Sequence, residues 1–139
     1  MILDRKKIIH LISISEDFMF LKEFNFSDNE ANAEFFKPEK FPFAAHFIND
    51  PIVPGSVILE FSLQAGVAFL MKKHNIKNNP LIGDARSRFF KKYDGESSLY
   101  VRITSNKEFD SGEILIADVR DENLERIMSA KLTYSFNYE

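Results

Sequence analysis

The chain has 139 residues, 45% of them hydrophobic, which is enough for one core and one domain over residues 1–139. Its formal charge of −3 and pI near 5.7 argue against a nucleic-acid-binding protein, which normally has a basic surface. The absence of cysteine excludes disulfides and thiolate metal sites. The three histidines match no metal-binding spacing, so we expect no metal.

The first 45 residues predict one short helix and one or two strands. Residues 3–12 favour the helix, and residues 17–26 favour a strand in which phenylalanines recur at even positions. Residues 27–45 predict loops with room for a second, brief strand. The apolar runs near the N-terminus are short and interrupted by charge, so we expect no signal peptide, no membrane span and a cytosolic location.

Residues 56–74 predict a long helix that is apolar nearly all round, which is typical of a buried helix. Strands are then predicted over 80–90, 98–105, 113–120 and 126–137, with turn residues between them. Consecutive strands joined by short turns are normally antiparallel neighbours. The expected fold class is therefore α+β, with a curved antiparallel sheet around one helix and an open edge on which a second copy can pair.

The segment HFINDPIVPGSVILE, residues 46–60, contains candidate acid–base residues. His46 precedes a stiff segment, Gly55 opens the predicted helix, and Glu60 lies just over one turn inside it, with Gln64 on the same face. Burial would raise the pKa of Glu60, and the amide of Gln64 can hold its carboxylate. A single histidine or mid-helix glutamate is more often structural, so only their joint order and spacing carry weight.

That joint pattern resembles the hot-dog-fold β-hydroxyacyl-acyl-carrier-protein dehydratases of fatty acid synthesis. The family signature is roughly H-F-P-G-x-P-[IV]-M-P-G-x-x-[IL]-x-E-A-x-x-Q, and this chain follows it without a gap. The matching residues are His46, Phe47, Pro51, Ile52, Pro54, Gly55, Glu60 and Gln64. Weaker similarity covers residues 2–5 and 88–96. The family's Pro-Gly after His-Phe is Ile48-Asn49 here, a departure expected to alter the mouth of the site.

The resemblance implies dehydration of a 3-hydroxyacyl thioester to a trans-2-enoyl thioester. His46 would remove the α-proton, Glu60 would protonate the leaving hydroxyl, and the Gly55 N–H would bind the thioester carbonyl. Ile52 and Gln64 would orient these groups. The substrate would arrive on the phosphopantetheine of an acyl carrier protein, with no metal or redox cofactor. The histidine and the acid would come from different subunits of a homodimer or of a trimer of dimers.

Two further sets of residues are candidates around such a site. A tunnel for the acyl chain would be lined by Phe61, Phe89 and Phe90, although aromatic residues at this spacing more often form a core. A basic patch for an acidic carrier protein would comprise Lys72, Lys73, Arg86, Arg88, Lys91 and Lys92, with ordinary solvated charge as the other explanation. His10 and His74 are interpreted as surface residues.

Two other functions remain open for the same fold. A hot-dog thioesterase would use Glu60 to activate water and would leave His46 without a clear role. A non-catalytic hot-dog subunit would pair with an active partner, although such a subunit has no need of His46, Glu60 and Gly55 together. The sequence leaves open the acyl chain length, its pathway, and any isomerase activity.

Overall fold

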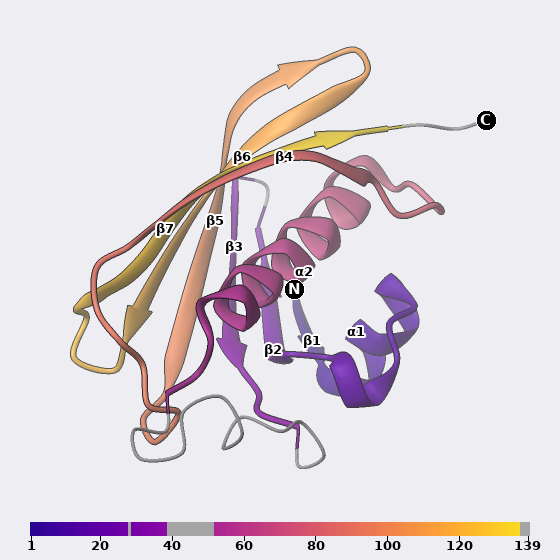
Figure 1. Cartoon of the computed structure of the whole chain (residues 1–139). Helices are drawn as coiled ribbons and strands as arrows, with labels where there is room; N and C mark the ends of the chain where they lie inside the picture. The colour runs from indigo at the N-terminus through magenta and orange to yellow at the C-terminus, as the bar shows by residue number, and fades with distance from the viewer. Residues whose placement is uncertain (28, 39–51, 137–139) are drawn as a thin grey trace.

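The fold is a curved antiparallel sheet wrapped around one long helix (Figure 1). A computed structural model describes residues 1–27, 29–38 and 52–136. Within these residues, seven strands lie in the order β1-β2-β3-β5-β6-β7-β4, and helix α2 (Gly55–His74) lies in the concave side. This arrangement confirms the expected α+β hot-dog class.

The N-terminal third contains β1 (Ile2–Asp4), α1 (Arg5–Ile12), the 3₁₀ turn η1 (Glu16–Phe18), β2 (Leu21–Phe26) and β3 (Glu30–Phe35). The carboxylate of Asp4 caps α1 by accepting from the Lys7 N–H at 2.9 Å. The predicted strand over 17–26 begins only at Leu21. The guanidinium of Arg5 explains this, because it donates to the carbonyl groups of Glu16, Met19 and Leu21 and so holds a turn there.

Helix α2 is the centre of the core, as its all-round apolar sequence predicts. Its length and composition would suffice to cross a membrane, but most of it is buried inside this protein as the core helix. A Cβ atom at Gly66 would overlap the hydroxyl of Tyr134 on β7, which itself donates to the Leu63 carbonyl at 2.8 Å. The glycine therefore lets the helix approach the sheet closely. The cytosolic location stays a prediction.

The C-terminal half supplies β4 (Leu81–Phe89), β5 (Leu99–Phe109), β6 (Gly112–Asp121) and β7 (Arg126–Ser135). The expectation that consecutive strands are neighbours holds for β5, β6 and β7 but is wrong for β4, which pairs with β7. The segment between β4 and β5 is long enough to cross the end of the sheet, so it is not a hairpin turn. All nine residues of β4 are exposed on this open edge.

Candidate active site

The N-terminus of α2 lies beside an apolar pocket. The carbonyl of Pro54 accepts from the Val57 and Ile58 N–H groups, so the helix starts directly after this proline. The N–H of Gly55 belongs to the first turn, where backbone donors have no partner within the helix and the dipole is positive. Such a donor is suited to binding a carbonyl oxygen on which negative charge develops.

The ring of Phe89 covers Gly55. A Cβ atom at position 55 would lie 2.9 Å from the ring Cζ, so any side chain there would displace the ring. The pocket has a volume of about 350 Å³, and its lining residues are Ile52, Val53, Gly55, Ile58, Phe89, Phe90, Lys91, Lys92 and Tyr93. Five candidates from the sequence, besides Gly55, thus meet in one place: Ile52, Phe89, Phe90, Lys91 and Lys92.

Glu60 is a half-buried carboxylate on α2, just over one turn beyond Gly55. Its Oε2 accepts a 2.9 Å hydrogen bond from Nε2 of Gln64. Burial raises the pKa of Glu60 above its ordinary value, and the hydrogen bond from Gln64 offsets part of this rise. Its Oε1 makes no hydrogen bond to any described residue. The carboxyl group can therefore carry a proton on one oxygen while the other is held in place.

The orientation of the Gln64 amide is fixed by backbone groups outside the helix. Its Oε1 accepts from the Phe20 N–H at 2.9 Å, and its Nε2 also donates to the Phe18 carbonyl at 2.7 Å. The side chain is almost fully buried. Since a backbone donor faces the oxygen and a backbone acceptor faces the nitrogen, the amide must present N–H to Glu60. Gln64 thus holds one oxygen of the Glu60 carboxylate in place, and its catalytic role stays a prediction.

Two other sequence candidates differ in their position. His46 lies outside the described residues. Phe61 is fully buried and packs edge to face on Phe35, with ring centroids 5.2 Å apart. Phe61 therefore belongs to the core, which was the other explanation for aromatic residues at this spacing. Phe89 and Phe90, in contrast, are 46% and 43% exposed and line the pocket.

The six cations proposed as one patch are divided between two ends of the molecule. Lys91 and Lys92 line the pocket that includes Gly55, while Lys72 follows Gly55 by 17 residues, about 25 Å along a helix. Several are paired with carboxylates: Lys73 with Glu108 and Glu113, Arg86 with Asp84, and Lys91 with Glu125 and Asp121. Arg88 lies over the Phe90 ring.

An ion-pair cluster at the C-terminus of α2 was missed from the sequence. The carboxylate of Glu113, on β6, is fully buried and contacts Nζ of Lys73 and Nε2 of His74, each at 2.7 Å. Burial alone would raise the pKa of Glu113, but hydrogen bonds from Lys73, Ser105 and His74 lower it below the ordinary value. His74 is exposed, as the sequence predicts, and its ring also contacts the buried carboxylate of Glu113. No local spacing could reveal a contact between residues 39 positions apart.

His74, Glu108 and Glu113 also bring three possible metal-ligand atoms within 4.8 Å of one another. The ammonium group of Lys73 contacts both carboxylates and already supplies the positive charge. The arrangement is thus explained as a structural ion-pair cluster.

Comparisons with known proteins agree with this fold. The model of the FabA-like domain matches residues 30–130. A structure of an HP0420 homologue from Helicobacter felis is 12% identical, with a TM-score of 0.73 over 96% of this chain and 86% of that one. A putative thioesterase from Lactococcus lactis is 10% identical, with a TM-score of 0.69 over 81% and 88%. A Streptococcus mutans protein bound to acetyl CoA is also 10% identical, with a TM-score of 0.66 over 81% and 86%. No curated protein matches the sequence.

Proposed function

The chain belongs to the FabA-like domain family, and on that premise we propose that it dehydrates a 3-hydroxyacyl thioester carried by an acyl carrier protein. Glu60 carries the proposal. Its pKa is raised, one of its oxygens is held by Gln64, and the other is without a described partner. This arrangement suits a group that gives up a proton near neutral pH.

In the proposed reaction, His46 takes the proton from C2 of the substrate while the C2–C3 double bond forms. The C3–O bond breaks, and Glu60 gives its proton to the departing hydroxyl, which leaves as water. The Gly55 N–H binds the thioester oxygen and stabilises the negative charge that develops there. Proton transfer from His46 to Glu60 through solvent restores both groups. The reaction needs no metal or redox cofactor.

Exposure along β4 supports assembly with a second copy. Leu81, Ile82 and Phe89 are all large apolar residues on this edge strand, and each is between 45% and 54% exposed. Pairing of β4 with the same strand of a second copy would satisfy its free backbone groups and cover these side chains. Because Phe89 also lies against Gly55, this pairing would place the second subunit next to the pocket, where the family resemblance predicts a shared site.

A hot-dog thioesterase is the second candidate, because four structural neighbours are described as known, putative or hypothetical thioesterases. That reaction would require Glu60 to be ionised in order to activate water. Burial raises the pKa of Glu60, which makes the ionised form harder to reach than for an ordinary glutamate and supports a role as proton donor. A non-catalytic subunit is the third candidate and would gain nothing from this arrangement.

The test is to incubate the purified protein with a 3-hydroxyacyl thioester and with the matching trans-2-enoyl thioester, on both pantetheine and acyl carrier protein. A dehydratase interconverts the two without releasing thiol. Release of free thiol without enoyl formation would replace this proposal by the thioesterase. Absence of both reactions for every chain length, with His46→Ala identical to the wild type, would favour the non-catalytic subunit.

A further inference from the structure

Arg5 is the first residue of α1, and its side chain is held against the turn that precedes β2. Its Nη1 donates to the carbonyl of Met19 at 2.7 Å and to that of Leu21 at 3.1 Å, and its Nη2 donates to the Glu16 carbonyl at 2.8 Å. The guanidinium carbon also lies 3.8 Å from the centre of the Phe36 ring. These contacts fix the guanidinium in one orientation, with its charge against backbone carbonyl groups.

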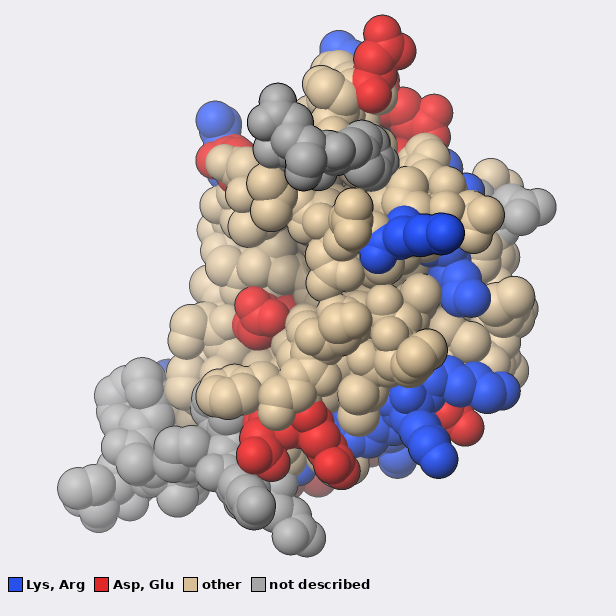
Figure 2. Space-filling view, turned by 90° about the vertical axis from the view of Figure 1, so that its right-hand side faces the viewer, with Lys and Arg blue, Asp and Glu red and all other residues tan. Residues whose placement is uncertain are grey.

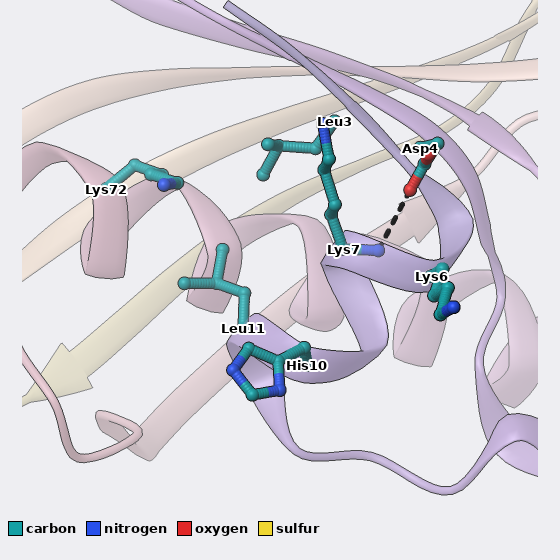
Figure 3. Close-up of a pocket in the computed structure, with 7 residues that line it drawn as sticks. All are labelled: Leu3, Asp4, Lys6, Lys7, His10, Leu11 and Lys72. Atoms are coloured by element: carbon teal, nitrogen blue, oxygen red, sulfur yellow. Dashed lines mark hydrogen bonds between the residues drawn. The ribbon is translucent and has the colours of Figure 1, made fainter.

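The other basic residues of α1 have a different environment. Lys6, Lys7 and His10 are exposed and line a groove between α1 and α2, where Asp4 caps α1 (Figure 3). On the side of the molecule where α1 lies, several Lys and Arg groups gather on one part of the surface (Figure 2). Water and salt screen such exposed charges, whereas Arg5 is partly buried. Arg5 therefore acts on the neighbouring backbone more strongly than these exposed groups.

One peptide group connects Arg5 to the candidate active site. The Met19 carbonyl, which accepts from Arg5, and the Phe20 N–H belong to the same planar peptide group. That N–H donates to Oε1 of Gln64 at 2.9 Å, and Nε2 of Gln64 donates to Oε2 of Glu60 at 2.9 Å. Three hydrogen bonds thus run in one direction from a cation, through a peptide group and a side-chain amide, to a carboxyl group.

The common direction of these bonds has a physical consequence, because successive hydrogen bonds polarise one another. The guanidinium draws electron density toward the Met19 oxygen, which makes the Phe20 N–H a stronger donor. This N–H in turn makes the Gln64 amide a stronger donor. A stronger donor holds the Glu60 carboxyl group more firmly and supports its ionised form.

We propose that Arg5 is a positioning residue for Glu60, which acts through the Met19–Phe20 peptide group and the amide of Gln64. The catalytic consequence rests on the proposed function, because only that function gives Glu60 a proton to transfer. The chain of hydrogen bonds itself can be tested without any substrate.

Ionisable groups also lie at both ends of this chain of hydrogen bonds. Glu16 is the charged neighbour of Arg5, which stays protonated wherever carboxyl groups titrate. Tyr134 lies near Glu60 and donates to the Leu63 carbonyl. Burial, and to a smaller extent the charge of Glu60, raise the pKa of Tyr134, so its phenol stays neutral in that range. The separate ¹³C signal of the exposed Glu16 carboxyl group distinguishes its titration from that of Glu60.

The first measurement uses the wild-type protein. The ¹³C signal of the Glu60 carboxyl group, the ¹⁵N signal of the Gln64 amide and that of the Phe20 N–H are followed by NMR as the pH is changed. We expect all three to move with the same midpoint, because the chain of hydrogen bonds connects them. A Phe20 signal that does not follow the Glu60 midpoint would overturn the proposal.

The second measurement removes the charge with Arg5→Gln. The pKa of Glu60 should then rise further above its ordinary value, since its ionised form loses support. In the Gln64→Leu background the same change should have no further effect. Arg120→Gln on β6 is the matched control, because Arg120 also donates to a backbone carbonyl, that of Leu124. A shift that persists without Gln64, or one that the control reproduces, would overturn the proposal.

Arg5→Lys tests the role of the charge. Because the lysine keeps the charge, the pKa of Glu60 should return toward that of the wild type, and a shift equal to that of Arg5→Gln would contradict polarisation by Arg5. Thermal unfolding of each variant identifies loss of folding. If Arg5→Gln does not fold, the wild-type titration decides.

Kinetics with the pantetheine substrate connect the chain of hydrogen bonds to the reaction. In Arg5→Gln, kcat should fall roughly three- to tenfold while KM changes by less than about twofold, since Arg5 holds the acid and not the substrate. An unchanged kcat in an active enzyme would overturn the positioning role. Absence of dehydration by the wild type would sink only the proposed function, because the NMR measurements need no turnover.

Discussion

Helix α2 has a glutamate near each of its ends, and the environments of the two differ. Glu60 is half-buried and lies on the helix, whereas Glu113 is buried on β6 and contacts the helix. Glu60 lies near the N-terminal end, where one amide is its hydrogen-bond partner and burial raises its pKa. Glu113 lies against the C-terminal end and is more deeply buried, yet its pKa is lowered because Lys73, Ser105 and His74 hold the charge. The depth of burial therefore does not decide the protonation state of these carboxyl groups. The hydrogen bonds and the positive charge that surround each carboxyl group do.

Replacing Glu60 is expected to give the largest effect. Glu60→Gln keeps the size of the side chain but cannot give up a proton, so kcat for dehydration should fall roughly 10²- to 10⁴-fold. The measurement is enoyl thioester formation at saturating substrate. Glu113→Gln is the matched control at the other end of α2 and should keep wild-type kcat with the pantetheine substrate. Equal loss in both variants would contradict a catalytic difference between the two glutamates.

Gln64→Leu should have the next largest effect, because it removes the amide that hydrogen-bonds to the Phe20 N–H and to the Phe18 carbonyl. We expect a loss of about 2–3 kcal/mol in the free energy of unfolding, measured with urea. The variant also removes the hydrogen bond that lowers the pKa of Glu60. Since the acid must be protonated, the fall of kcat at high pH should then move to still higher pH. An unchanged pH profile would argue that this fall belongs to another group.

Glu113→Gln should cost roughly 2 kcal/mol of stability at neutral pH, because charged hydrogen bonds from Lys73 and His74 are lost. A lowered carboxyl pKa stabilises the fold above the ordinary value of 4.5, and this contribution is lost as the pH falls through the lowered pKa. The difference between wild type and variant should therefore shrink below about pH 4.5. The matched change Glu108→Gln, at a 56% exposed side chain, should cost less than about 0.5 kcal/mol.

The smallest expected effect is the change in the free energy of unfolding caused by Glu60→Gln. Unlike the two preceding variants, this one should be more stable than the wild type. A raised carboxyl pKa means that the folded protein binds the proton more tightly, so stability falls as the pH rises from 4.5 through the folded-state pKa. The variant should thus be more stable than the wild type by less than about 1 kcal/mol at pH 8, and by less at pH 4. Urea unfolding at the two pH values measures this. A variant less stable at pH 8 would mean that ionised Glu60 is well solvated.

The sequence predicts those features that depend on neighbours along the chain. The position of α2 and of the last four strands follows from hydrophobic periodicity, although β5 continues to Phe109, four residues beyond its predicted end. The contact between Glu60 and Gln64 follows from helical spacing. Contacts between distant segments could not be predicted in this way. Pairing of β4 with β7 and the contact of Gln64 with Phe20 are set by how the sheet closes around the helix. Burial of Phe61 and the division of the basic residues also depend on that closure.

The open edge at β4 has a consequence for how the protein responds to dilution. If the active species is two copies joined along this strand, folding and assembly share one equilibrium, and the apparent melting temperature rises with protein concentration. Specific activity would then fall on dilution and recover on concentration, without any change in the chain. The cell could thus set the activity per molecule by setting the amount of protein, through a strand whose nine residues all lie exposed in a single copy.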